Sequence, residues 1–92
     1  MVYVCLYNNT KIISFLWAKR SNCTMHIMSL WTDTNWRRKG MGKQLKVELE
    51  KWCVKTGIKT IETTVHIENK SMISLNKKLQ YESKYIRMEK RL

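Results

Sequence analysis

The sequence predicts a small α/β domain with a mixed, mostly antiparallel sheet and two helices in the order βββ-α-β-α-β. Three observations predict it. Short β-rich apolar runs separated by turn residues fill the first third of the chain. A long stretch with apolar residues at helical spacing follows, and the strand and helix patterns then alternate once more. The 92 residues suit one domain, 1–92, because the chain is too short to divide into two hydrophobic cores.

Three predicted strands come first. Val2 to Tyr7 is apolar on both alternating faces, a pattern typical of a strand covered on both sides. The turn residues Asn8-Asn9-Thr10 separate it from Ile12 to Trp17, so the two runs predict a hairpin. Lys19 to Asn22 predicts the next turn, and Cys23 to Thr32 predicts the third strand.

An amphipathic helix is predicted from about Gly40 to Thr56, and Gly57 ends it as a residue able to take positive φ. Its apolar stripe comprises Met41, Leu45, Leu49, Trp52 and Cys53. Its outward-facing side chains are expected to be Lys46, Glu50 and Lys51.

Two strands and one helix complete the prediction. Thr60 to Ile67 has β-branched residues on one face and predicts a strand. Asn69 is a suitable cap for a second helix, which carries Met72, Leu75 and Leu79 at helical spacing. Tyr85 to Glu89 predicts a closing strand.

The composition limits the classes of protein. No segment reaches the roughly 20 apolar residues of a membrane span, and the N-terminus lacks the pattern of a secretory signal. Three cysteines without CxxC or Cys/His spacing indicate free thiols in a reducing cytoplasm and no metal site. A net charge of +11 attracts polyanions: nucleic acid, an acidic protein surface or a phosphate-rich cofactor.

Two of the three glycines lie together in Arg37-Arg38-Lys39-Gly40-Met41-Gly42-Lys43, between a predicted strand and a predicted helix. The start of a helix offers free N–H groups and a partial positive charge, which together bind phosphate. Glycine lets the backbone approach phosphate oxygens, and four cationic side chains strengthen the field. The alternative is a glycine-containing turn with solvated charges, since short glycine motifs are weak evidence.

This run resembles the Arg/Gln-x-x-Gly-x-Gly/Ala signature of the GCN5-related N-acetyltransferase (GNAT) superfamily, here Arg37-x-x-Gly40-x-Gly42. A second segment, Val65-x-x-x-Asn69-x-x-Met72-x-x-Leu75-Asn76-x-Lys78-Leu79-Gln80-Tyr81, resembles the family's later motif. The resemblance covers roughly residues 12 to 92 and implies a minimal GNAT-like form that lacks the usual N-terminal strand and helices.

The resemblance implies that the chain binds acetyl-CoA and transfers acetyl to an amine, including a protein lysine. Backbone amides from Arg38 to Lys43 would hold the pyrophosphate, and Asn69 would contact the cofactor. Main-chain groups of the preceding strand would pair with the pantetheine arm. The residues assigned to cofactor binding are therefore Leu30, Trp31, Thr32, Arg37, Arg38, Lys39, Gly40, Met41, Gly42, Lys43 and Asn69.

The catalytic residues depart from the family pattern. The usual acid is a Tyr where this chain has Asn76, which can donate a hydrogen bond but not a proton of suitable pKa. Tyr81 is the first substitute, with core packing as its alternative. His26 stands where some members carry a Glu that acts as the general base, and its imidazole could accept a proton. Glu62, His66 and Glu68 are secondary candidates.

Three functions stay open at this point. The first is an acetyl-CoA-dependent N-acetyltransferase whose amine acceptor belongs to a macromolecule with an acidic surface, with a homodimer as one way to complete the acceptor site. The second is a catalytically degenerate GNAT-fold module that binds cofactor or protein. Asn76 in place of the family's acidic Tyr favours this second function. The third is a small basic nucleic-acid-binding protein, in which aromatic residues between basic ones stack on bases.

Overall fold

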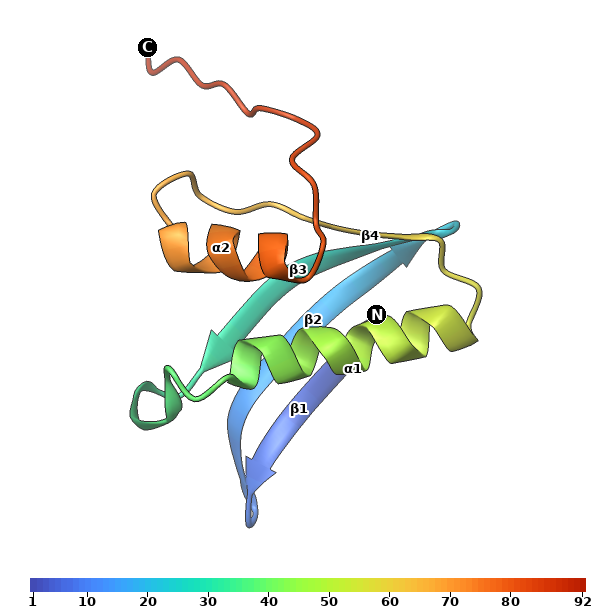
Figure 1. Cartoon of the computed structure of the whole chain (residues 1–92), viewed down its shortest axis with the longest axis vertical. Coiled ribbons are helices and arrows are strands. Elements are labelled where there is room, and N and C mark those ends of the chain that lie inside the picture. The colour runs from blue at the N-terminus through green and yellow to red at the C-terminus, as the bar shows by residue number, and fades with distance from the viewer.

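The computed structural model describes all 92 residues and has one sheet with two α-helices (Figure 1). The sheet order is β1-β2-β3-β4; the first three strands are antiparallel and β4 runs parallel to β3. The predicted mixed, mostly antiparallel sheet with two helices is confirmed. The elements are β1 (Val2–Asn8), β2 (Lys11–Ser21), β3 (Thr24–Thr32), the 3₁₀ helix η1 (Thr34–Trp36), α1 (Met41–Lys55), β4 (Thr60–Thr63) and α2 (Lys70–Lys78).

Two tight hairpins connect the antiparallel strands. Each turn contains an asparagine with positive φ, Asn9 at 57° and Asn22 at 54°, a conformation that Asn adopts more readily than most residues. The second turn lies later than predicted. Lys19 and Arg20 still belong to β2 and pair with β3, so the strand continues to Ser21. The polar character of these two residues reflects exposure and not a turn.

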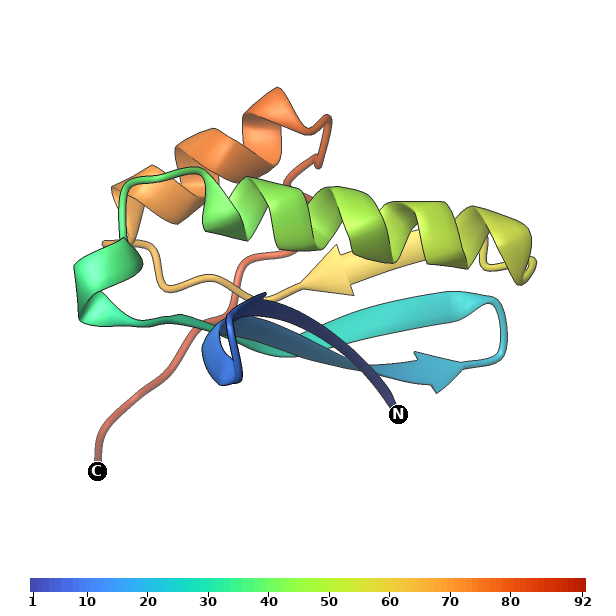
Figure 2. The ribbon, with the colours of Figure 1, turned by 90° about the horizontal axis from the view of Figure 1, so that it is seen from below.

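Both helices cover the same face of the sheet, as Figure 2 shows. The core lies between α1 and the sheet, and only 12 of the 92 residues are buried, so each buried contact carries a large share of the stability. Neither helix has the length and apolar character needed to cross a membrane. The main core cluster consists of Leu16, Ala18, Met25, Ile27, Leu45, Leu49, Cys53 and Ile58.

The predicted stripe of α1 is correct for its centre and wrong at two positions. Leu45, Leu49 and Cys53 are buried as expected, whereas Trp52 is 38% exposed. Lys46, expected to face outward, is only 3% exposed. The reason is that α1 packs against two neighbours: the sheet covers the apolar stripe, and groups from α2 and its C-terminal end meet Lys46 on the flank of the helix.

Strands β3 and β4 separate after four residue pairs. The last parallel pair is Ile27 with Thr63, and β4 ends there instead of continuing to Ile67 as predicted. Immediately beyond that pair, the register between β2 and β3 shifts, because Trp17 pairs with Ser29 and Ala18 with Ile27. Met28 is thus the extra residue of a β-bulge, which bends and twists its strand. The bulge turns the rest of β3 away from β4.

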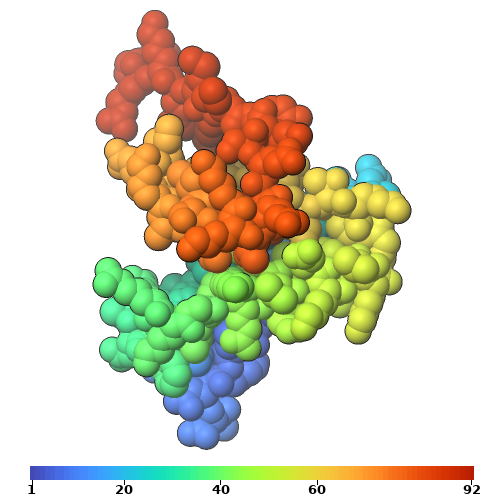
Figure 3. Space-filling model, in the orientation of Figure 1, coloured from blue at the N-terminus to red at the C-terminus, as the bar shows by residue number.

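The predicted closing strand from Tyr85 to Glu89 is not formed. Residues 81–92 contain no helix or strand, and Tyr85, Ile86 and Met88 are almost fully exposed. Figure 3 shows the last residues clear of the body of the molecule. A strand needs a partner along its whole length, and β4, with four residues, offers only a short edge.

Helix α2 ends in a Schellman motif that returns the chain toward α1. The amide of Tyr81 donates to the carbonyl of Asn76 and that of Gln80 to the carbonyl of Lys77. Gln80, between them, has φ 69°, the left-handed conformation that favours glycine. The motif fixes the position of Tyr81 relative to α2 at the expense of backbone strain at Gln80.

Replacing Gln80 by glycine should therefore stabilise the protein by about 1 kcal/mol, because the left-handed conformation is strained for a residue with a Cβ atom. Urea denaturation measures the change. Gly57→Ala is the matched control with the opposite expected sign. Gly57 has φ 79° and no atom would clash with an added Cβ, so backbone strain alone should destabilise the protein by about the same amount. A neutral or destabilising Gln80→Gly would show that Gln80 is not strained.

Candidate active site

A cavity of about 180 Å³ occupies the space where β3 and β4 separate. The strands supply two of its walls, and residues of α1 and α2 supply the rest. Because the strands no longer pair here, the backbone groups along their facing edges are available to a ligand. The lining residues are Ile27, Met28, Ser29, Leu30, Lys46, Thr63, Thr64, Val65, His66, Asn69 and Met72.

The start of α1 presents a row of free amides. The first helical hydrogen bond runs from Gln44 N–H to the Gly40 carbonyl, and the amides from Arg38 to Lys43 donate to no acceptor within the chain. Gly40 caps the helix with φ 79°, and Arg38 also has positive φ, at 62°. The loop has the free N–H groups and the helix dipole that bind phosphate.

The four cations of this loop divide into two kinds. Arg37 Nε donates to the Thr32 carbonyl over 3.1 Å, and Lys39 Nζ lies 5.2 Å from the centre of the Trp36 ring. These two side chains brace the loop against β3 and η1. The side chains of Arg38 and Lys43 are exposed and form no ion pair, so they are the pair of charges that can meet a ligand.

Gly42 serves a different purpose from Gly40. A Cβ atom on Gly42 would meet Leu75 at 3.7 Å and Leu30 at 3.8 Å, which is ordinary contact distance. Gly42 therefore faces β3 and α2, and a small residue there lets the start of α1 approach the end of the cavity.

The expected pantetheine-binding residues lie partly on the cavity. Leu30 lines it, whereas Trp31 and Thr32 lie beyond it. The Trp31 carbonyl accepts from the Ser14 hydroxyl at 2.8 Å, its ring packs 5.8 Å from Phe15, and the Thr32 carbonyl accepts from Arg37. The part of β3 that lines the cavity without pairing with β4 is Met28 to Leu30, which begins two residues before the expected segment Leu30 to Thr32.

Asn69 caps α2 and also lines the cavity, whereas its predicted contact with the cofactor stays a prediction. Its Oδ1 accepts from the Met72 amide at 3.2 Å and from the Ser71 hydroxyl at 3.3 Å, so it caps α2. Asn69 also lines the cavity, and its side-chain NH₂ has no acceptor within the chain. A capped helix start thus places an amide donor on the cavity wall.

Asn76 and Tyr81 meet at Lys46. Lys46 Nζ donates to Asn76 Oδ1 over 2.8 Å and lies 5.0 Å from the centre of the Tyr81 ring. Of the three residues, only Lys46 lines the cavity. Two predicted catalytic residues are therefore close together, but they reach the cavity through a lysine that sequence reasoning placed in solvent.

Burial changes the pKa values of this cluster in opposite directions. Removal from water lowers the pKa of Lys46 from its ordinary 10.5 to about 8, because burial disfavours the charged ammonium. Burial, with smaller contributions from Glu50 and Cys53, raises the pKa of the Tyr81 phenol to about 12. Of the two, Lys46 gives up its proton more readily.

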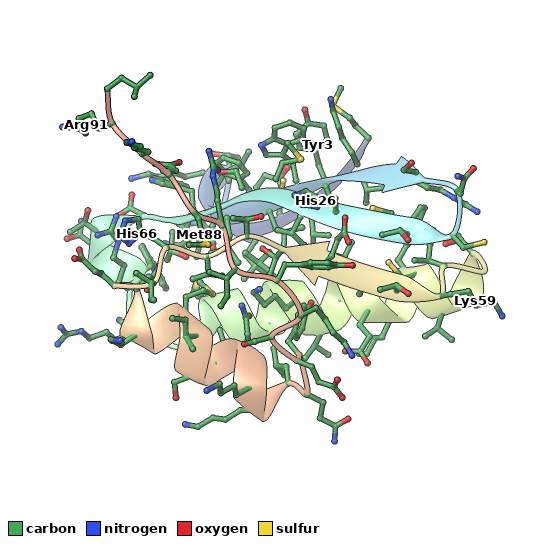
Figure 4. The ribbon with its side chains drawn as sticks, turned by 90° about the horizontal axis from the view of Figure 1, so that it is seen from above. Tyr3, His26, Lys59, His66, Met88 and Arg91 are labelled. Atoms are coloured by element: carbon green, nitrogen blue, oxygen red, sulfur yellow. The ribbon has the colours of Figure 1, made fainter.

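His26 lies apart from this cluster. It pairs with Glu62 across β3 and β4, with 3.1 Å between Nδ1 and the carboxylate, and both side chains are accessible. Its neighbours Met25 and Ile27 face the core, so His26 faces the other side of the sheet (Figure 4). It precedes by one residue the point at which the strands separate. His66 lines the cavity and accepts from the Glu68 amide at 3.1 Å.

Sequence reasoning missed Met28, Ser29, Thr64 and Lys46 as cavity residues. The strand assignment concealed the first three, because a bulge and an early strand end carry no local sequence signal. The signal for Lys46 was its position directly after Leu45, on the edge of the apolar stripe.

Comparisons with known proteins support the same family. The sequence profile of the Acetyltransferase (GNAT) family matches residues 1–81. No curated protein sequence matches the chain. Many solved structures share the fold.

The ribosomal-protein-S18-alanine N-acetyltransferase from Escherichia coli superposes with a TM-score of 0.90 at 23% identity, over 94% of this chain and 56% of that one. An aminoglycoside acetyltransferase from an uncultured soil metagenomic sample, in complex with sisomicin, superposes with a TM-score of 0.79 at 17% identity, over 98% of this chain and 64% of that one. The PaiA N-acetyltransferase from Thermoplasma acidophilum, in complex with coenzyme A, superposes with a TM-score of 0.79 at 24% identity, over 85% of this chain and 49% of that one. The chain thus spans about half to two thirds of these proteins.

The lowered pKa of Lys46 predicts a pH dependence of stability. Between pH 8 and 10 the unfolded chain retains the Lys46 proton that the folded protein has released, so the free energy of unfolding should rise with pH. Above pH 10 the raised pKa of Tyr81 has the opposite effect. Urea denaturation should show this rise for the wild type between pH 7 and pH 10. Lys46→Met should lack it, so the difference in stability between the two proteins should change with pH. Lys59→Met, which removes an exposed lysine elsewhere, is the control, and parallel curves for Lys46→Met would contradict the assignment.

Proposed function

Because this chain belongs to the GNAT acetyltransferase family, we propose that it binds acetyl-CoA and transfers its acetyl group to an amine. The observation that carries the proposal is the continuity of two features, a cavity between separating strands and a row of free amides at the start of α1. Leu30 lines the cavity and contacts the position of Gly42 in the first turn of α1, so one elongated ligand can touch both.

The residues at this site fit the two ends of acetyl-CoA. The diphosphate suits the amides from Arg38 to Lys43 and the free side chains of Arg38 and Lys43. The pantetheine arm carries amide groups, which suit the unpaired edge of β3 from Met28 to Leu30 and the NH₂ group of Asn69. Apolar side chains such as Met72 and Val65 cover the arm.

Acetyl transfer requires a neutral amine that attacks the thioester carbonyl carbon. The His26–Glu62 pair is an exposed proton acceptor on the sheet face opposite the helices, one residue from the separation of the strands. A carboxylate oxygen of Glu62 at 3.1 Å from Nδ1 orients the imidazole. We therefore assign the acceptor amine to this side and the cofactor to the helix side.

The charge of +11 favours an acceptor carried by an acidic macromolecule, because a positive field concentrates negative partners. A second copy of the chain could complete the acceptor site. The alternative, cofactor binding without turnover, is favoured by Asn76 at the position of the family's acid. Nucleic-acid binding is supported by charge alone, since the Trp17 ring stacks on Tyr3 and the Trp31 ring packs at a tilt against Phe15.

Reversing one free charge of the loop should weaken acetyl-CoA binding. Lys43→Glu changes the charge by two beside the free amides and should raise the dissociation constant by roughly tenfold or more at low salt, with loss of much of the effect at high salt. Isothermal titration calorimetry measures it, and stabilisation of the wild type by acetyl-CoA in a thermal melt is the first check.

Lys59→Glu is the matched control, because it makes the same charge change just past the other end of α1, about 20 Å away. Figure 4 shows Lys59 at the opposite end of the molecule from His66. Equal weakening by both variants would mean that net charge, and not the loop, governs binding. Thiol release with lysine peptides then separates transfer from binding alone.

A further inference from the structure

We propose that Lys46 supplies the proton to the thiolate that leaves during acetyl transfer, and that Asn76 holds the Lys46 ammonium in place. This inference rests on the proposed function. It assigns the acid to a residue of α1, where neither the family motif nor the chain's own glycine loop indicated one.

Geometry selects Lys46 from the groups around the cavity. Only two titratable side chains line it, Lys46 and His66. His66 is exposed at the rim (Figure 4), and its Nδ1 already accepts from the Glu68 amide. Lys46 is the buried one, and its ammonium is fixed by a 2.8 Å hydrogen bond on a helix that packs on the sheet. Asn76, which cannot deliver a proton, does not itself line the cavity.

The chemistry of the surrounding groups supports the same role. Tyr81 contacts Lys46 through its ring face, and Glu50 and Cys53 are the charged and titratable groups beside Tyr81. No carboxylate pairs with the ammonium, so burial lowers the pKa of Lys46 to about 8, close to that of an ordinary thiol. Proton transfer between groups of similar pKa near working pH is efficient.

Acetyl transfer exchanges the carbon–sulfur bond of the thioester for a carbon–nitrogen bond. The acceptor nitrogen forms a bond to the acyl carbon, and the carbon–sulfur bond breaks with its electron pair left on sulfur. An Nζ–H proton of Lys46 passes to that sulfur and gives the free thiol. The acceptor nitrogen releases its surplus proton through the His26 imidazole to solvent, and the neutral Lys46 amine takes one up from solvent.

The test titrates the thiol of bound coenzyme A, followed by the ultraviolet absorbance of the thiolate, so it needs no turnover and no known acceptor. An ammonium next to sulfur should lower the pKa of the bound thiol by about one unit, which is a tenfold larger thiolate fraction at neutral pH. Lys46→Met should lose this effect, and Lys59→Met should keep it. Wild type should also bind coenzyme A more tightly than desulfo-coenzyme A, whereas Lys46→Met should bind both alike.

The double variant Lys46→Met/Asn76→Leu removes both hydrogen-bonding partners and leaves no buried polar group unpaired, so it controls for misfolding of the single variant. Equal thiol pKa values in wild type and in the Lys46 variants, with coenzyme A bound to each, would overturn the role of Lys46 and leave the proposed function intact. Coenzyme A that fails to bind the wild type would overturn both.

A kinetic experiment compares two acetyl donors whose leaving thiols differ in their need for a proton. With a lysine peptide as acceptor, Lys46→Met should slow transfer from acetyl-CoA by about tenfold or more, within the range that positioned acids contribute. Acetyl transfer from a thioester of a nitrothiophenol, whose thiolate leaves without a proton, should be slowed much less by the same substitution. An equal loss with both donors, or mass spectrometry showing stable acetylation of Lys46 itself, would contradict the role of proton donor.

Discussion

The separation of β3 from β4 after four residue pairs is the constraint on which the rest of the site depends. Had the two strands stayed paired to Thr32, their edge groups would bond each other and no space would open between them. The bulge at Met28 ends the pairing, and α2, capped by Asn69, covers the gap from the helix side. After β3 the chain passes through η1 and the loop 37–40 into α1, so the open strand edge and the free helix amides are neighbouring parts of one surface.

A buried lysine is expensive in a protein of this size. Taking an ammonium out of water costs several kcal/mol unless hydrogen bonds offset the loss, and Lys46 has one amide oxygen and one ring face. An apolar side chain of similar length would pack in the same place without that cost. In a chain with only 12 buried residues, the position is thus better explained by the cavity that Lys46 lines than by stability.

Local chemistry predicted much of this structure. The Asn69 cap, the helix end at Gly57 and the cation-rich helix start at Gly40 depend on neighbouring residues alone, and all three lie where the sequence indicated. The errors share a different cause. The direction of Lys46 depends on α2, the length of β4 depends on a bulge in β3, and a strand after Tyr85 would depend on a partner edge. The local sequence around each of these residues does not indicate such long-range contacts.

Gln80 and Asn76 differ in their physical consequence. Gln80 takes the left-handed conformation that favours glycine, which adds strain at one backbone position and leaves the helix end unchanged. Asn76 in place of tyrosine cannot be considered alone, because its oxygen is the hydrogen-bond acceptor for Lys46. A tyrosine there would fill the space that the lysine side chain uses and would leave the ammonium without a carbonyl-type acceptor. An asparagine without the lysine would leave a buried amide unpaired. Each residue satisfies the hydrogen-bonding group of the other in the buried interior. The two residues therefore act as one unit, in which an ammonium held by an amide stands in place of a phenol.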